Sequence, residues 1–167
     1  MKLCVIGTGY VGLVSGTCFA DIGNQVYCVD KDVKKINKLN SGISPIYEPG
    51  LDELLKKNFL SKRLIFTTDL KKAISSSDVI FICVGTPNKI GSLKVDLSYV
   101  YKCTKEILAY TKNKKIIVTK STVPVGSGDD IERILKNKKN LFSVISNPEF
   151  LREGEAIRDF RYPDRIV

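Results

Sequence analysis

The sequence feature that most constrains the fold is a glycine-rich turn near the start of the chain. An apolar run over 2–6 leads into Gly7-Thr8-Gly9-Tyr10-Val11-Gly12, and a second apolar run over 25–29 ends at Asp30. A strand, a Gly-x-Gly-x-x-Gly turn, a helix and a second strand that ends in an acidic residue form the fingerprint of a dinucleotide-binding unit. A glycine-rich turn without a ligand is the alternative interpretation.

Each part of the fingerprint has a physical task in binding a dinucleotide. Gly7 allows the tight turn, Gly9 lets a pyrophosphate approach the bare backbone, and Gly12 permits close packing of helix on strand. The helix begins with Tyr10 and Val11, and its free backbone N–H groups attract an anion. We therefore expect all five residues to belong to the cofactor site.

The acidic residue after the second strand bears on which dinucleotide binds. Asp30 is expected to accept hydrogen bonds from the adenosine ribose hydroxyls, and its charge would repel the 2′-phosphate of NADP. Lysines on one side of the following helix could instead attract that phosphate; they are Lys31, Lys34, Lys35 and Lys38. We favour NAD as the cofactor, with Lys35 on the adenine side.

Strand-like and helix-like stretches alternate along the rest of the chain. The further strands are expected over 64–67, 78–84, 115–119 and 141–146, and the helices over 10–21, 32–40, 51–58, 68–74, 96–110 and 127–135. Thr68, Asp96 and Ser127 are expected to cap the last three helices, and a loop is expected over 88–95. This alternation predicts an α/β fold with a doubly wound, mainly parallel Rossmann-type sheet and helices on both faces.

Ligands of such sheets bind beyond the carboxyl ends of the strands, which points to particular loops. The loops over 7–12, 85–87, 121–124 and 147–153 should open onto one rim. Gly85, Thr86, Ser121 and Thr122 offer backbone N–H and hydroxyl groups to a cofactor there. For the two threonines, turn formation beside proline is an equally good interpretation.

Two carboxylates, Glu149 and Glu153, are expected at the same rim. They lie four residues apart, so they would share a face if this segment were helical. The chain contains no histidine, and a carboxylate near the nicotinamide is then a reasonable proton acceptor. An exposed helix start with a Glu–Arg pair that involves Arg152 explains the same residues equally well.

Composition narrows the class of protein. The chain has 167 residues and a net charge of +9, but its lysines are dispersed, which favours solvated helix faces over a nucleic-acid partner. No apolar run approaches eighteen residues, so we expect a cytoplasmic protein without a membrane partner. The five cysteines are scattered through apolar runs and indicate buried thiols, with no metal site.

Five segments in this order resemble the nucleotide-sugar dehydrogenases of the UDP-glucose/GDP-mannose dehydrogenase family. They are 7–12 (Gly-Thr-Gly-Tyr-Val-Gly), 45–51 (Pro-Ile-Tyr-Glu-Pro-Gly-Leu), 84–87 (Val-Gly-Thr-Pro), 120–126 (Lys-Ser-Thr-Val-Pro-Val-Gly) and 147–154 (Asn-Pro-Glu-Phe-Leu-Arg-Glu-Gly). The last two are far more specific than the glycine triplet. The ending over 162–167 resembles the UDP-glucose branch more than the GDP-mannose branch.

The resemblance implies an enzyme that oxidises UDP-glucose twice, to UDP-glucuronate, with two NAD. It implies that Glu149 is a general base, that Thr122 helps to hold the catalytic water, and that Glu153 lies near both nicotinamide and sugar. The substrate would be bound by Glu149, Phe150, Leu151, Arg152 and Glu153. Related enzymes of UDP-N-acetylmannosamine or GDP-mannose, and a dinucleotide-sensing module without catalysis, are the alternatives.

One departure from the family pattern affects the expected activity. The family's nucleophilic cysteine lies in a Gly-Gly-x-Cys-Phe-Pro-Lys-Asp-like motif, and none of the five cysteines has such surroundings. We therefore expect residues 1–150 to form the NAD(P)-binding domain and 151–167 to begin the connection to a central helix and a UDP-sugar domain of a homo-oligomeric enzyme. The isolated chain is expected to bind NAD without completing the oxidation.

Overall fold

The computed structural model describes residues 1–89, 91–92 and 94–166. Positions 90 and 93 belong to the loop expected over 88–95, and position 167 belongs to the connection expected over 151–167. Those parts of the two predictions lie outside the described residues.

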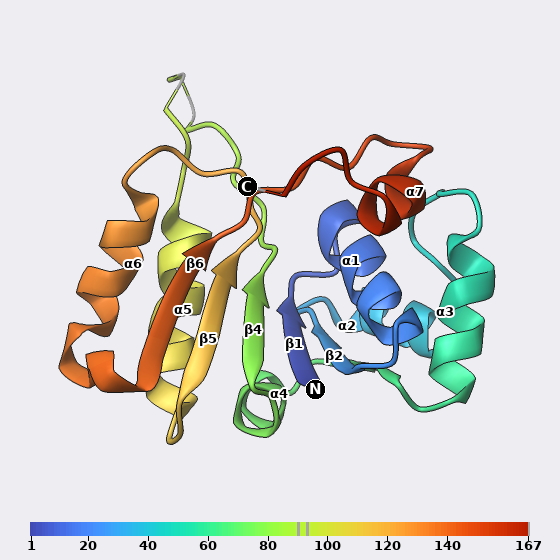
Figure 1. Cartoon of the computed structure of the whole chain (residues 1–167), viewed down its shortest axis with the longest axis horizontal. Helices are drawn as coiled ribbons and strands as arrows, with labels where there is room; N and C mark the ends of the chain where they lie inside the picture. The colour runs from blue at the N-terminus through green and yellow to red at the C-terminus, as the bar shows by residue number, and fades with distance from the viewer. Residues whose placement is uncertain (90, 93, 167) are drawn as a thin grey trace.

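Six parallel strands form one sheet through the middle of the molecule (Figure 1). They are β1 (Lys2–Ile6), β2 (Gln25–Val29), β3 (Leu64–Thr67), β4 (Val79–Ile82), β5 (Lys115–Thr119) and β6 (Phe142–Ser146). Their order in the sheet is β3-β2-β1-β4-β5-β6, so the direction of winding reverses between β1 and β4. This is the strand order of a Rossmann-type fold, and the reversal places a ligand crevice beyond the ends of those two strands.

Helices cover both faces of this sheet, which confirms the doubly wound fold. The helices are α1 (Tyr10–Asp21), α2 (Val33–Asn40), α3 (Leu51–Leu60), α4 (Leu70–Ser76), α5 (Ser98–Tyr110), α6 (Ser127–Leu135) and α7 (Ala156–Arg161), with a 3₁₀ segment over Lys136–Leu141. The first three helices and α7 pack on one face, and α4, α5 and α6 pack on the other.

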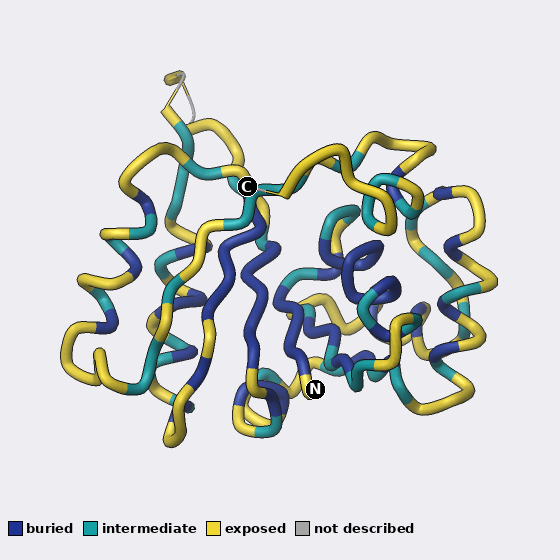
Figure 2. The backbone as a smooth tube through the Cα atoms, viewed as in Figure 1, coloured by how far each residue is buried: buried dark blue, intermediate teal, exposed yellow. Residues whose placement is uncertain are grey.

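The strands alternate their side chains between two apolar cores. Leu3 and Val5 belong to the core under α1, while Cys4 and Ile6 belong to the core under α5. Strand β4 is buried at every position, as expected for a parallel strand that is covered on both faces (Figure 2). All five cysteines are buried free thiols, as predicted.

Helix α1 lies unusually close to the sheet because glycines face it. A Cβ on Gly12 would lie 1.9 Å from the carbonyl oxygen of Gly7, and a Cβ on Gly16 would lie 2.4 Å from the Cys28 sulfur on β2. Neither distance is possible for real atoms, so only glycine permits this approach. The helix ends before Gly23, whose φ of 101° suits the stop that the sequence indicated.

Three predicted helix caps are wrong by one residue. Helix α4 is capped by Asp69, whose carboxylate accepts from Lys72 N, and not by Thr68. Leu97 precedes α5, because Asp96 instead forms a local turn by accepting from Ser98 N. Gly126, with φ of 87°, precedes α6. At α4 the neighbour offers the acceptor, at α6 the neighbour is a glycine with positive φ, and at α5 the acceptor is still Asp96, one residue before the cap position.

The short helix α7 was not predicted, and it packs against α1. Phe160 meets Phe19 edge to face with 4.9 Å between ring centroids. Arg161 pairs with Asp21 at 2.7 Å, and Lys57 of α3 pairs with the same carboxylate at 2.8 Å. The domain boundary at residue 150 stays a prediction. Among the described residues, no helix is both long and apolar enough to cross a membrane.

The contact between Gly16 and Cys28 generates a prediction about stability. Gly16→Ala should destabilise the chain by about 1–3 kcal/mol, because the added methyl group overpacks a fully buried site. Gly128→Ala in α6 is the matched control, since its Cβ would meet open space, and it should stabilise the chain by up to about 1 kcal/mol. Urea unfolding followed by circular dichroism measures both. Equal stabilities of the two variants would contradict the close packing of α1.

Candidate functional site

Four loops meet at the carboxyl ends of the central strands, around a cavity of about 240 Å³. They follow β1, β4, β5 and β6. The lining residues are Gly9, Tyr10, Val11, Cys83, Val84, Gly85, Thr86, Lys120, Ser121, Thr122 and Glu149. The structure therefore brings together most of the residues that the sequence placed in the cofactor site.

The start of α1 leaves backbone donors available on this cavity. The first hydrogen bond of the helix is donated by Leu13 N to Gly9 O at 2.9 Å, so the amides of Tyr10, Val11 and Gly12 precede it. In the part of the chain that the structure describes, no side chain caps this helix. The space beside Gly9 is open, with no atom within 4 Å of a Cβ built there. These features fit a pyrophosphate at the helix start.

Asp30 lies behind the glycine turn and is hydrogen-bonded on both oxygens. Oδ2 accepts from Thr8 N at 3.0 Å, from Thr8 Oγ1 at 2.8 Å and from Lys35 Nζ at 2.9 Å, and Oδ1 accepts from Asp32 N at 3.1 Å. Burial alone would raise the pKa of Asp30, but these donors outweigh it and lower the pKa to about 2. Thr8 was missed by the sequence analysis, although it occupies the first variable position of the fingerprint.

The loops after β4 and β5 are tied to each other by their hydroxyl groups. Thr86 Oγ1 donates to Thr122 O at 3.0 Å, and Ser121 Oγ donates to Val84 O at 2.7 Å. The hydroxyl of Thr86 therefore joins two loops and does not close a local turn beside Pro87. These bonds give the cavity wall a defined shape.

The two predicted rim carboxylates are arranged differently from each other. Glu149 is half-buried on the cavity, and its Oε2 accepts from Leu151 N at 2.7 Å. Glu153 is exposed and is not among the cavity-lining residues. Residues 147–155 are not helical, so Glu149 and Glu153 do not share a helix face as the conditional prediction required.

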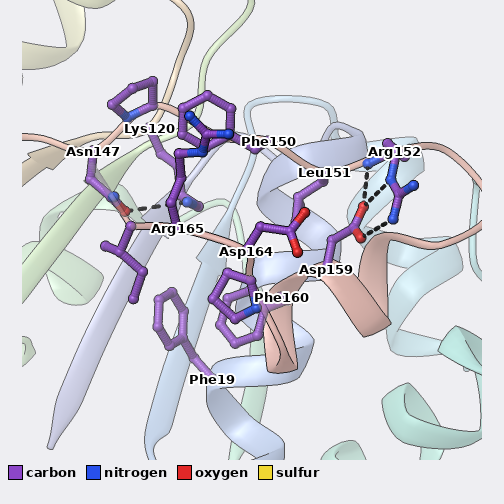
Figure 3. Close-up of a pocket in the computed structure, with 13 residues that line it drawn as sticks. Phe19, Lys120, Asn147, Phe150, Leu151, Arg152, Asp159, Phe160, Asp164 and Arg165 are labelled. Carbon is purple, nitrogen blue, oxygen red and sulfur yellow. Dashed lines mark hydrogen bonds and ion pairs between the residues drawn. The ribbon is translucent and has the colours of Figure 1, made fainter.

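A larger cavity of about 660 Å³ opens beside the first one (Figure 3). Phe19 and Phe160 form its floor, and Phe150, Leu151 and Arg152 line it together with the final segment of the chain over 163–166. Phe150, Leu151 and Arg152 are three of the predicted substrate-binding residues. The two cavities are neighbours because Lys120 lines both of them.

The Glu–Arg pair that was considered for Arg152 is not formed in the described structure. Arg152 instead pairs with Asp159 of α7, with Nη2 to Oδ1 at 2.7 Å and both Nε and the backbone N donating to Oδ2 (Figure 3). These bonds hold the pKa of Asp159 at about 2. The sequence pattern did not predict this pair, because Asp159 lies seven residues after Arg152, beyond a turn.

Lys120 is a second residue that the sequence analysis did not place in the site. Its side chain is 8% exposed, and Nζ donates to Asn147 Oδ1 at 3.3 Å. Burial lowers the pKa of Lys120, and the nearby Cys83 and Glu149 act in the opposite direction. The signal for Lys120 was its place directly before Ser121 in the 120–126 segment.

Glu48 is the third missed residue, and it is 5% exposed. Its carboxylate accepts from Tyr10 OH, from Gly154 N at 2.8 Å and from Ala156 N at 2.9 Å. The available signal was that Glu48 is the one acidic residue in the turn-rich connection over 41–50. Within the described ranges, no group of three or more His, Cys, Asp or Glu side chains could hold a metal ion.

Comparison with known sequences connects the whole chain to one family. The sequence model described as "UDP-glucose/GDP-mannose dehydrogenase family, NAD binding domain" matches residues 1–167. A UDP-glucose 6-dehydrogenase from Rhizobium meliloti is 58% identical over 169 residues, which are 100% of this chain and 39% of that protein. Another from Bacillus subtilis is 53% identical and covers 99% of this chain and 36% of that protein. The chain thus spans less than half the length of these relatives.

Solved structures show the same fold. A GDP-mannose dehydrogenase from Pseudomonas aeruginosa superposes with a TM-score of 0.94 at 41% identity, over 100% of this chain and 40% of that one. A UDP-glucose dehydrogenase from Pyrobaculum islandicum has a TM-score of 0.91 at 40% identity, over 99% of this chain and 39% of that one.

The hydrogen bonds of Asp30 generate a prediction about pH dependence. Because its folded pKa is depressed, its contribution to stability is fully present above its unfolded pKa and is lost as pH falls through about 2. Asp30→Asn should therefore lower the free energy of unfolding by on the order of 2 kcal/mol at pH 7. The difference in unfolding free energy between the variant and wild type should narrow between pH 4 and pH 2. Urea titrations at each pH measure it. Asp52→Asn, at an exposed position of α3, should keep the wild-type pH dependence; a gap for Asp30→Asn that does not change with pH would contradict the assignment.

Proposed function

The chain belongs to the UDP-glucose/GDP-mannose dehydrogenase family as its NAD-binding domain, and on this premise we propose that it is the coenzyme-binding part of an NAD-dependent UDP-glucose 6-dehydrogenase. Its cofactor is NAD. The proposed whole reaction converts UDP-glucose to UDP-glucuronate with two NAD. The sequence relatives named above, both UDP-glucose 6-dehydrogenases, support this substrate over the alternatives.

The observation that carries the proposal is the composition of the smaller cavity. The first residues of α1, the loops at Gly85 and Ser121, and Glu149 all line one space of about 240 Å³. A module that only sensed a dinucleotide would not need a half-buried carboxylate on that cavity. The proposal therefore assigns chemistry to this rim as well as binding.

In the proposed complex the pyrophosphate rests on the amides of Tyr10, Val11 and Gly12. Asp30 accepts hydrogen bonds from the ribose hydroxyls, which requires that it exchange some of its present donors, and Lys35 stays beside it. Gly85, Thr86 and Ser121 line the nicotinamide half through backbone groups, since the hydroxyls of Thr86 and Ser121 are engaged.

When bound, NAD supplies the acceptor for the hydride that leaves the sugar carbon. Glu149 takes up a proton as general base and Thr122 helps to hold a water molecule beside it. Lys120 lines the same cavity as Glu149 and places a positive charge beside it. Phe150, Leu151 and Arg152 contact the sugar nucleotide from the larger cavity, and Glu153 contacts it from the same segment. For Arg152 this means that it releases Asp159, which holds both its side chain and its backbone N–H.

The second oxidation in the proposed reaction needs a cysteine thiolate, and the five cysteines of this chain are unsuited to supply it. Burial raises the pKa of all five thiols, with the pKa of Cys18 and Cys83 at about 12. We propose that the nucleophile comes from a further domain, in a homo-oligomeric cytoplasmic enzyme. GDP-mannose and UDP-N-acetylmannosamine, the substrates of related dehydrogenases, are the second choice of substrate.

The role of Asp30 generates a prediction about cofactor choice. Calorimetric titration of the chain should show NAD binding, with NADP weaker by about tenfold or more, because one repelled phosphate readily supplies the required 1.4 kcal/mol or so. Asp30→Asn should narrow the difference between the two cofactors. Equal affinity of the wild-type chain for NAD and NADP would count against the proposed cofactor geometry.

The role of Glu149 generates a prediction about turnover. In a chimera that joins residues 1–167 to the remaining part of the Rhizobium meliloti relative, Glu149→Gln should reduce kcat by about a hundredfold or more, as expected for loss of a general base. The dissociation constant for NAD should change little. Glu132→Gln, at an exposed position of α6, is the control and should leave kcat unchanged.

The same assay tests the need for a further domain. The 167-residue chain alone should release no NADH from UDP-glucose and NAD. Steady UDP-glucose-dependent NADH formation by the chain alone would refute the proposal that the nucleophile lies elsewhere.

A further inference from the structure

Glu48 is a buried carboxylate that the proposed chemistry does not use. It lies in the connection between α2 and α3, far along the chain from the rim residues, and its side chain is 5% exposed. Among the described residues, Glu48 takes part in no salt bridge. A buried charge is costly unless hydrogen bonds compensate it, so its partners should reveal why an acid is placed there.

The partners of Glu48 come from two distant parts of the chain. Oε2 accepts from Tyr10 OH at the start of α1 and from Gly154 N at 2.8 Å, and Oε1 accepts from Ala156 N at 2.9 Å. Burial alone would raise the pKa of Glu48, but these donors together with Ile157 N outweigh it and lower the pKa. The carboxylate thus joins the dinucleotide-binding helix to the segment that leads into α7.

Besides Glu48, other groups in the body of the protein contact this segment. Lys120 Nζ donates to Asn147 Oδ1 at 3.3 Å, and Tyr10 OH, which also bonds to Glu48, donates to Arg152 O at 3.4 Å. Residues 147–155 form no regular helix or strand. Glu149 bonds to Leu151 and Arg152 bonds to Asp159, and both of these links stay within the rim segment and α7. Asn147 N donates to Thr119 O at one end of the segment. At the other end, Gly154 adopts a φ of 88° and presents its amide to Glu48.

We propose that Glu48 is a positioning residue that holds residues 149–155 over the start of α1. This rests on the proposed function, because Glu149 and Glu153 are the rim carboxylates assigned there to the nicotinamide and sugar. Through Tyr10, the same carboxylate contacts the helix whose amides receive the pyrophosphate. Glu48 thereby sets the distance between the pyrophosphate site and the catalytic rim.

Apolar packing alone does not explain why this position holds an acid. Ala156, Ile157 and Phe160 already belong to the core around α1 and would attach α7 to the protein. An apolar residue at position 48 would leave the amides of Gly154 and Ala156 without this acceptor, and the amide of Ala156 is buried. Glutamine would set an N–H donor against at least one of these amides. A carboxylate accepts all of these donors at once and therefore fixes the orientation of the turn.

The test measures two ligands that differ only at the nicotinamide end. In the 167-residue chain, Glu48→Gln should weaken NADH binding by about tenfold, as one lost charged acceptor implies. Binding of ADP-ribose, which lacks nicotinamide, should stay within about twofold of wild type. Amide exchange followed by NMR should be faster by about tenfold at Gly154 and Ala156, while Val5 and Ile80 in the sheet stay protected.

Two further variants make the result decisive. Glu53→Gln, at an exposed position of α3, removes the same charge and should match wild type in every measurement. Gly154→Ala leaves Glu48 intact but strains a backbone with φ of 88° where a Cβ has open space, and it should reproduce the split between NADH and ADP-ribose. If Glu48→Gln does not fold, Gly154→Ala still tests the positioning role.

The outcomes separate this inference from the proposed function. A wild-type chain that binds neither NADH nor ADP-ribose overturns the proposed function. In that case, the amide exchange rates of Gly154 and Ala156 in Glu48→Gln alone test whether Glu48 anchors this segment. If wild type binds both ligands and the Glu48 and Gly154 variants weaken neither, or weaken both equally, the positioning role is overturned. Unchanged exchange at Gly154 and Ala156 overturns it as well.

Discussion

The close approach of α1 to the sheet is the constraint on which the rest of the site depends. Gly7, Gly12 and Gly16 have no side chains, and a Cβ on any of them would meet atoms of β2, of the residue after β4 or of the turn itself at 2.5 Å or less. The helix can therefore start directly at the end of β1, with its first amides facing the rim. A bulkier sequence would push the helix outward and move those amides away from the strand ends.

Two carboxylates hold the residues on either side of Gly9. Thr8 is bonded to Asp30 at the end of β2, and Tyr10 is bonded to Glu48 in the connection before α3. The residues before and after Gly9 are thus held by hydrogen bonds to side chains, while Gly9 itself has no side chain. This arrangement leaves open space beside Gly9, and it keeps two negative charges compensated by hydrogen bonds close to the place where an anion is to bind.

Lys120 supplies the opposite charge between the two cavities. It is buried between Cys83, Asn147 and Glu149, and it lines both the cofactor cavity and the larger one beside it. Lys120 thus places a positive group on the wall of the larger cavity, which Phe150, Leu151 and Arg152 also line.

Local spacing in the sequence determined the strand positions, the βα alternation and the glycine turn, because periodicity and turn chemistry act within a few residues. The same spacing identified the rim loops, since parallel strands all end at one edge. It misplaced the caps at Thr68, Asp96 and Ser127 by one residue, because the exact start of a helix depends on the backbone geometry and hydrogen bonds of adjacent residues. Only the tertiary structure decided that residues 147–155 are not helical and that Arg152 turns to Asp159. Glu48 meets Tyr10 across 38 positions and Ala156 across 108, and no local pattern encodes a contact between residues that only the packing of α1, α3 and α7 brings together.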